Sequence, residues 1–84
     1  MSNPNYKYNA MFDILYLRLA DSDNSYGHED ENGVIINYDY DTKRAVGADI
    51  WDFKRRISNK KPIVLPFQVD LHSIFSEINK LSAC

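Results

Sequence analysis

The chain has 84 residues, of which 44% are hydrophobic and 26% are charged, and its net charge is −2 at pH 7. This length allows one domain, residues 1–84, with one modest core, and this composition argues against an intrinsically disordered chain. No apolar run approaches membrane-spanning length, and the only cysteine, Cys84, excludes an internal disulfide. We therefore expect a cytoplasmic protein with no membrane partner.

The charge is unevenly distributed along the chain. Residues 1–42 carry two basic and eight acidic side chains, whereas residues 43–84 carry eight basic and four acidic ones. This asymmetry is compatible with a polarised surface or with two solvated faces of a sheet, and we favour the second interpretation.

Short apolar runs separated by polar turns predict an antiparallel sheet. An Asn-Gly pair at 32–33 predicts a hairpin turn, because these residues tolerate positive φ. The polar stretches at 21–25 and 39–44 are typical of loops. The strands are expected, in chain order, at residues 6–8, 12–20, 26–29, 34–38 and 45–50.

Alternation within the strands predicts which side chains are buried. The second strand places Leu15, Leu17 and Leu19 on one face, and we expect them to be buried with Ile36 and Ile50. Its other face carries Ile14, Tyr16 and Arg18.

Two helices are expected after the last strand. Residues 51–57 predict a short helix or turn, and Asp70 is a plausible N-cap for a final helix. The apolar stripe of that helix comprises Leu71, Ile74, Phe75, Ile78 and Leu81. The predicted fold is therefore α+β: a four- or five-stranded antiparallel β-meander with a short helix and a C-terminal α-helix.

Three motifs occur in a recognisable order. They are Tyr8-Asn9 followed by Asp13-Ile-Leu-Tyr-Leu17, then Asn32-Gly-Val-Ile-Ile-Asn-Tyr-Asp39, then Val46-Gly-Ala-Asp-Ile50. This pattern resembles the domain-of-unknown-function 2283 family of small bacterial proteins. The resemblance covers residues 6–57 and leaves residues 62–82 as a C-terminal extension. Asn9 and Asn37 depart from the family, which usually has acids there, and the 39–44 turn lacks the usual glycine.

The resemblance implies a small cytoplasmic protein, bacterial or from a phage, built on an antiparallel sheet. The family has no established catalytic residues to transfer to this chain. Its members often occur beside small toxin-like proteins, which suggests an antitoxin role.

The residues themselves do not favour an enzyme, a cofactor or a metal site. The carboxylates considered for acid–base chemistry are Asp13, Asp39, Asp49 and Asp52. No cleft signal accompanies them, and Asp13 and Asp39 are better interpreted as turn residues. His28, His72 and Cys84 lack the spacing of metal ligands. We expect neither catalytic residues nor cofactor.

A protein partner, toxin-like or otherwise acting on nucleic acid, is the favoured interpretation, together with a homodimer. The candidate contact residues are Ile14, Tyr16, Arg18 and Ile35 on the outward sheet face, with Glu29, Asp30 and Glu31 as mimics of nucleic-acid charge. A competing interpretation is that residues 51–69 fold back and cover this face.

The alternative function is a small nucleic-acid-binding regulator that uses the basic segment 51–61. Its cations could contact phosphates, and Trp51 or Phe53 could stack on bases. The residues concerned are Trp51, Lys54, Arg55, Arg56, Lys60 and Lys61. The acidity of the whole chain weakens this interpretation, and such a cluster is more often a solvated helix face.

Overall fold

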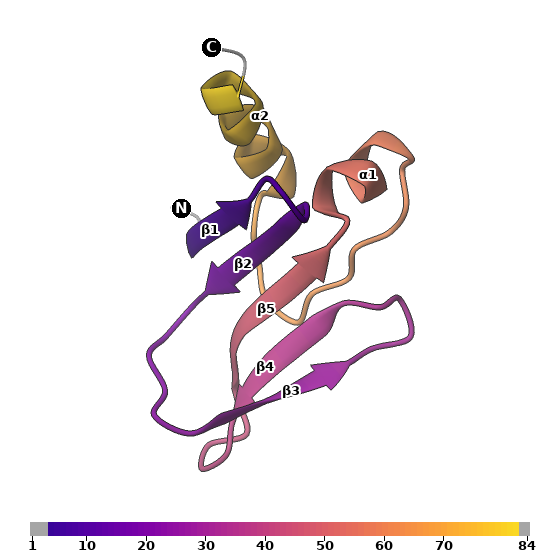
Figure 1. Ribbon diagram of the computed structural model, residues 1–84. Coiled ribbons are helices and arrows are strands. Elements are labelled where there is room, and N and C mark those ends of the chain that lie inside the picture. The colour runs from indigo at the N-terminus through magenta and orange to yellow at the C-terminus, as the bar shows by residue number, and fades with distance from the viewer. Residues whose placement is uncertain (1–3, 83–84) are drawn as a thin grey trace.

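A computed structural model describes residues 4–82, with side chains from 4 to 80. The sheet contains β1 (Asn5–Asn9), β2 (Ile14–Arg18), β3 (Ser25–Glu29), β4 (Ile35–Asp39) and β5 (Ala45–Trp51), and the helices are α1 (Phe53–Ser58) and α2 (Leu71–Ser82) (Figure 1). The predicted α+β class, with an antiparallel sheet, a short helix and a C-terminal helix, is confirmed. Cys84 lies outside the described residues.

The strand order is β1-β2-β5-β4-β3, and every neighbouring pair is antiparallel. The expectation of a sequential meander was therefore wrong at one step, because β5 lies between β2 and β4. The burial of the strands explains this order. β5 has seven residues and is largely buried, which suits a central strand, whereas the mostly exposed β3 occupies an edge.

One face of the sheet, called the covered face here, carries the core. Leu15, Leu17, Ile36 and Ile50 are buried as expected, and Phe53, Ile74 and Ile78 of the helices join them. Apolar side chains of the connection between the helices, including Ile63, Leu65 and Phe67, pack against the same cluster. Figure 1 shows this connection passing behind the sheet. Residues 51–69 therefore do not cover the outward face, contrary to the competing interpretation above.

Leu19 is the exception among the predicted core residues, with 40% of its surface exposed. β2 ends at Arg18, so Leu19 lies beyond the regular strand. The backbone N–H groups of Leu19 and Ala20 both donate to the carbonyl of Val46, beside an irregularity in the pairing of β4 with β5. The strand therefore ends at Arg18, two residues before the end at residue 20 that the apolar pattern predicts.

The start of α1 is capped by a residue distant in sequence. Asp52 adopts a left-handed conformation (φ 57°) and its side chain forms no capping hydrogen bond. Instead, the Asp13 carboxylate accepts hydrogen bonds from the backbone N–H groups of Lys54 (2.9 Å) and Arg55 (3.3 Å). It also accepts one from the Tyr8 hydroxyl at 2.6 Å. Asp13 thus joins β1, the β1–β2 turn and α1.

The predicted N-cap of the final helix is confirmed. The backbone N–H of Ser73 donates to the Asp70 carboxylate at 3.1 Å, and α2 begins at the next residue after Asp70. Within the predicted stripe, Ile74 and Ile78 are buried and Leu71 and Phe75 are half-buried. The side chain of Leu81 lies outside the described part of the chain. The helix therefore packs on the sheet of its own chain.

Candidate interaction surface

The opposite side of the sheet, called the open face here, is covered by no other element among residues 4–82 (Figure 1). The strand registers place one residue from each strand in a single row across this face. This central row consists, from β1 to β3, of Lys7, Tyr16, Asp49, Ile35 and Glu29. It brings together Tyr16, Ile35 and Glu29, which are three of the residues predicted to contact a partner, from three different strands.

A hollow of about 890 Å³ lies beside the central row. Gly47 contributes only backbone to it and lies between Arg18 and Asn37 in the sheet. A Cβ atom at Gly47 would collide with the carbonyl oxygen of Leu17, so this position requires glycine. The β2–β3 loop lines another part of the hollow with residues 20–23. The hollow is therefore a shallow, mainly polar depression in the open face.

Asp49 is the most unusual charged group of this surface. It lies on the central strand, and burial raises the pKa of its carboxyl group above the ordinary value. The side-chain amide of Asn37 donates to it at 3.4 Å, which partly opposes that shift in pKa. No lysine or arginine among the described residues forms an ion pair with it, and Arg18, on the neighbouring strand, pairs with Asp21 at 3.8 Å. Asp49 is thus a half-buried carboxylate that no cation in the described part of the chain neutralises.

Aromatic and apolar side chains occupy the end of the open face near α1. Trp51 is 49% exposed and Tyr16 is 39% exposed, while Ile35 is half-buried. Ile14 also belongs to this face, where it lies between Asn9 and Trp51 in its row. Its exposed fraction is only 3%, so the expectation that Ile14 contacts a partner was wrong. The alternation placed it on the right face but did not show that its neighbours bury it.

The three acids predicted to mimic nucleic-acid charge, Glu29, Asp30 and Glu31, have two different roles. The Asp30 carboxylate accepts hydrogen bonds from the backbone N–H groups of Asn32 (2.9 Å) and Val34 (3.0 Å). It therefore builds the β3–β4 turn. Glu29 and Glu31 remain exposed, Glu29 at the end of the central row and Glu31 in the turn.

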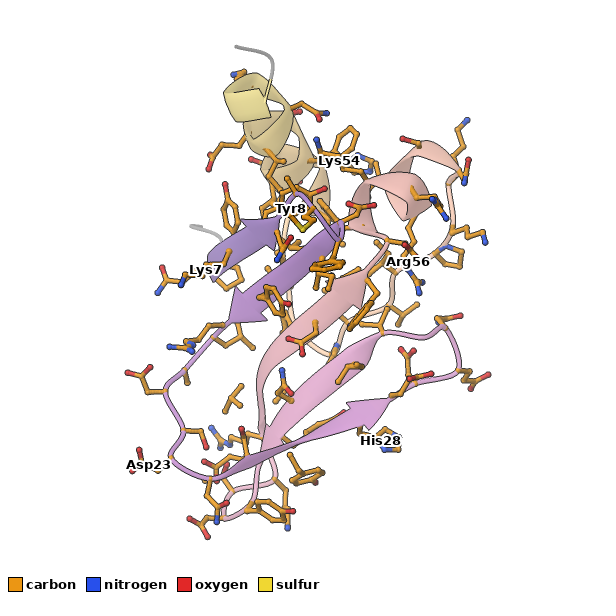
Figure 2. All side chains as sticks on the ribbon, viewed as in Figure 1. Lys7, Tyr8, Asp23, His28, Lys54 and Arg56 are labelled. Atoms are coloured by element: carbon orange, nitrogen blue, oxygen red, sulfur yellow. The ribbon has the colours of Figure 1, made fainter. Side chains whose placement is uncertain are left out.

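The basic segment is also divided by the structure. The Arg56 guanidinium donates to the backbone carbonyls of Trp51 and Asn32, both at 2.8 Å, and the Lys54 ammonium lies 5.5 Å from the centre of the Tyr8 ring (Figure 2). These two cations hold α1 against the sheet. Tyr8 belongs to the covered face, so Lys54 and Trp51 do not face the same side. The exposed cations of the segment are Arg55, Lys60 and Lys61.

Sequence reasoning missed part of this surface. Lys7 was not considered as a contact residue, and Asp49 was weighed only as a catalytic carboxylate. The position of Asp49 between Ala48 and Ile50, which are both fully buried, indicates that its side chain faces the other way. Its neighbours across the sheet depend on the strand order, which local patterns do not specify.

Among the residues that the structure describes, no group of three or more His, Cys, Asp and Glu side chains is arranged to hold a metal ion. No helix in this part of the chain is long and apolar enough to cross a membrane. Comparison with known proteins found no matching family model, no matching curated protein and no matching solved structure. The resemblance to the domain-of-unknown-function 2283 family therefore stays a prediction from its three motifs.

Proposed function

We propose that this chain is a non-enzymatic, cytoplasmic interaction module that binds another protein through the open face, in the manner of an inhibitor or antitoxin. One observation carries the proposal. The helices and their connection all pack on the covered face, so the central row remains accessible across all five strands. A mixed aromatic, apolar and charged surface of this kind is typical of protein interfaces.

The side chains of the open face indicate how a partner would be held. Tyr16, Trp51 and Arg18 are exposed, and these residue types supply most of the binding energy at protein interfaces. Asp49 lies among them, and no cation of the described residues pairs with it. A lysine or arginine of the partner placed over Asp49 would supply that missing charge.

The charges around the hollow favour a partner with a basic surface. Asp21, Asp23 and Asp49 line it, and among the described residues its only cations are Lys7 and Arg18. Proteins that act on nucleic acids carry basic grooves for phosphates, and a carboxylate surface can occupy such a groove. A toxin-like protein that acts on nucleic acid therefore fits the open face better than an acidic partner does.

The test compares what variants of the chain capture from cells of the native host. The open-face variant is Tyr16→Glu/Ile35→Glu, and the matched control is Val64→Glu, because Val64 is an exposed apolar side chain in the helix connection. We expect the wild type and the control to retain the same basic protein and the open-face variant to lose it. A folded open-face variant that captures the protein as well as the wild type would refute the proposal.

The charge of Asp49 can be tested separately from the shape of the surface. Asp49→Asn preserves the size of the side chain but removes the carboxylate, while Asp23→Asn removes an exposed carboxylate at the margin of the hollow. We expect the first substitution to weaken capture by about tenfold or more, as at other desolvated charge pairs. The second substitution should have little effect on affinity, because an exposed charge contributes little.

Nucleic-acid binding is the second candidate function, and the exposed cations Arg55, Lys60 and Lys61 support it. It ranks second because Arg56 and Lys54 are engaged within the chain. Binding of short DNA and RNA duplexes should then fall steeply with salt, and Lys60→Ala/Lys61→Ala should reduce that dependence. Affinity that does not change with salt or with this variant would exclude the candidate.

A further inference from the structure

The strand β3 forms a free edge of the sheet. It is the last strand in the order, and no helix lies beside its outer side in Figure 1. At one end of the β3–β4 pair the Asp30 N–H donates to the Val34 carbonyl at 2.9 Å, and at the other the Tyr40 N–H donates to the Asn24 carbonyl at 3.0 Å. These two bonds determine which residues of β3 direct their backbone N–H and C=O groups towards β4.

Antiparallel strands alternate between residues that bond to the neighbour and residues that do not. The two bonds at the ends of the pair join 30 with 34 and 24 with 40. The even-numbered residues Tyr26 and His28 therefore bond to β4. The backbone N–H and C=O groups of Ser25, Gly27 and Glu29 then point away from the sheet. They form a short row of donors and acceptors that another strand can use.

The opposite edge of the sheet is protected, and β3 is not. β1 carries Lys7 at its centre and follows Pro4, and the Tyr6 hydroxyl donates to Glu77 of α2 beside it. Lysine, proline and a covering helix are the usual means by which proteins block pairing at an edge. β3 has none of these and has Gly27 at its centre.

We propose that two copies of the chain pair through β3 in antiparallel orientation, with Gly27 opposite Gly27 of the partner subunit. This register pairs all the outward backbone groups, for about six hydrogen bonds between the copies. It places Ser25 opposite Glu29 of the partner subunit, and Tyr26 opposite His28 of the partner subunit. No two like charges face each other, so no charge repulsion opposes this register.

The pairing joins two five-stranded sheets into one continuous sheet. Its two-fold axis is perpendicular to the sheet, because paired residues of antiparallel strands project to the same side. The open faces of both copies then lie on one side, and the helices lie on the other. The dimer uses the edge and leaves the central row accessible, so this inference stands independently of the proposed function.

A charge series at two positions tests both the pairing and its register. Lysine is chosen for position 25 because Ser25 faces Asp39 within its own chain, so a glutamate there would disturb the monomer. Ser25→Lys places a lysine opposite Glu29 of the partner subunit at two symmetric points. We expect the dissociation constant of the dimer to fall by about tenfold. Ser25→Lys/Glu29→Lys places lysine opposite lysine, and we expect the dimer to weaken by about tenfold relative to the wild type.

Sedimentation equilibrium over a range of concentrations measures the dissociation constant, and circular dichroism checks that each variant folds. Val64→Glu in the connection between the helices serves as the control and should leave the constant unchanged. A wild type that stays monomeric at millimolar concentration would overturn the proposal. So would equal effects of the single and double lysine variants, or a dimer abolished by Tyr16→Glu on the open face but insensitive to both lysine variants.

Discussion

Asp13 should be the most sensitive polar residue of the fold, because one carboxylate serves three donors. Replacing Asp13 by alanine removes the cap of α1, which costs about 1–2 kcal/mol. It also leaves the half-buried Tyr8 hydroxyl without its acceptor, which adds about 1 kcal/mol. Alanine also fits the left-handed backbone at this position poorly, which adds about 1 kcal/mol. We expect a loss of about 3–4 kcal/mol from a total stability of about 4–13 kcal/mol for a chain of this size.

Urea unfolding followed by circular dichroism measures this loss, and two further substitutions separate its causes. Asp13 has φ 57°, a conformation that asparagine and glycine tolerate better than alanine. Asp13→Asn retains an acceptor and should cost about 1 kcal/mol or less. Asp13→Gly loses the cap without the backbone penalty and should be about 1 kcal/mol less destabilising than alanine. If Asp13→Ala unfolds at the same urea concentration as the wild type, Asp13 does not hold α1 in place.

Four other substitutions have expected outcomes in the same unfolding assay. Leu17→Ala should cost about 2–5 kcal/mol, whereas Leu19→Ala, at an exposed position, should cost much less. Burial raises the pKa of Asp49, so its charged form opposes folding above that pKa. Asp49→Asn should therefore stabilise the chain at pH 7 but not at pH 3. Hydrogen bonds from the backbone of Thr42, the Ser22 hydroxyl and the backbone of Asp41 lower the pKa of Asp39. Its contribution is present above the unfolded pKa and is lost as the pH falls through the folded one, so Asp39→Asn should flatten the acid side of the stability profile.

The features that could be predicted from the sequence are those set by neighbouring residues. The alternation of Leu15 with Tyr16 identified the covered and open faces, and Asp70 marked the start of α2, because both signals act within one turn or one strand. The position of β5 between β2 and β4 could not be predicted, since the pattern of a strand does not name its partners.

The roles of individual charged residues were harder to predict for the same reason. Asp13 and Arg56 act on backbone groups 41 and 24 residues away, respectively. From the sequence, Asp13 is a turn residue and Arg56 is one of several exposed cations. Only the fold distinguishes Arg56 from Arg55, whose side chain forms no long-range hydrogen bond among the described residues.

The position of Asp49 links the stability of the fold to the proposed use of the open face. A carboxylate on a central strand is desolvated by its neighbours, and no cation of the described chain compensates it. An uncharged residue there would make the sheet more stable, so the stability of the fold does not account for an acid at this position. A partner that supplies a cation would convert this cost into binding energy, because the carboxylate is already partly desolvated and held beside Asn37. If two copies pair through β3, both carboxylates face the same side, and a partner with two basic sites would bind more tightly than one site allows.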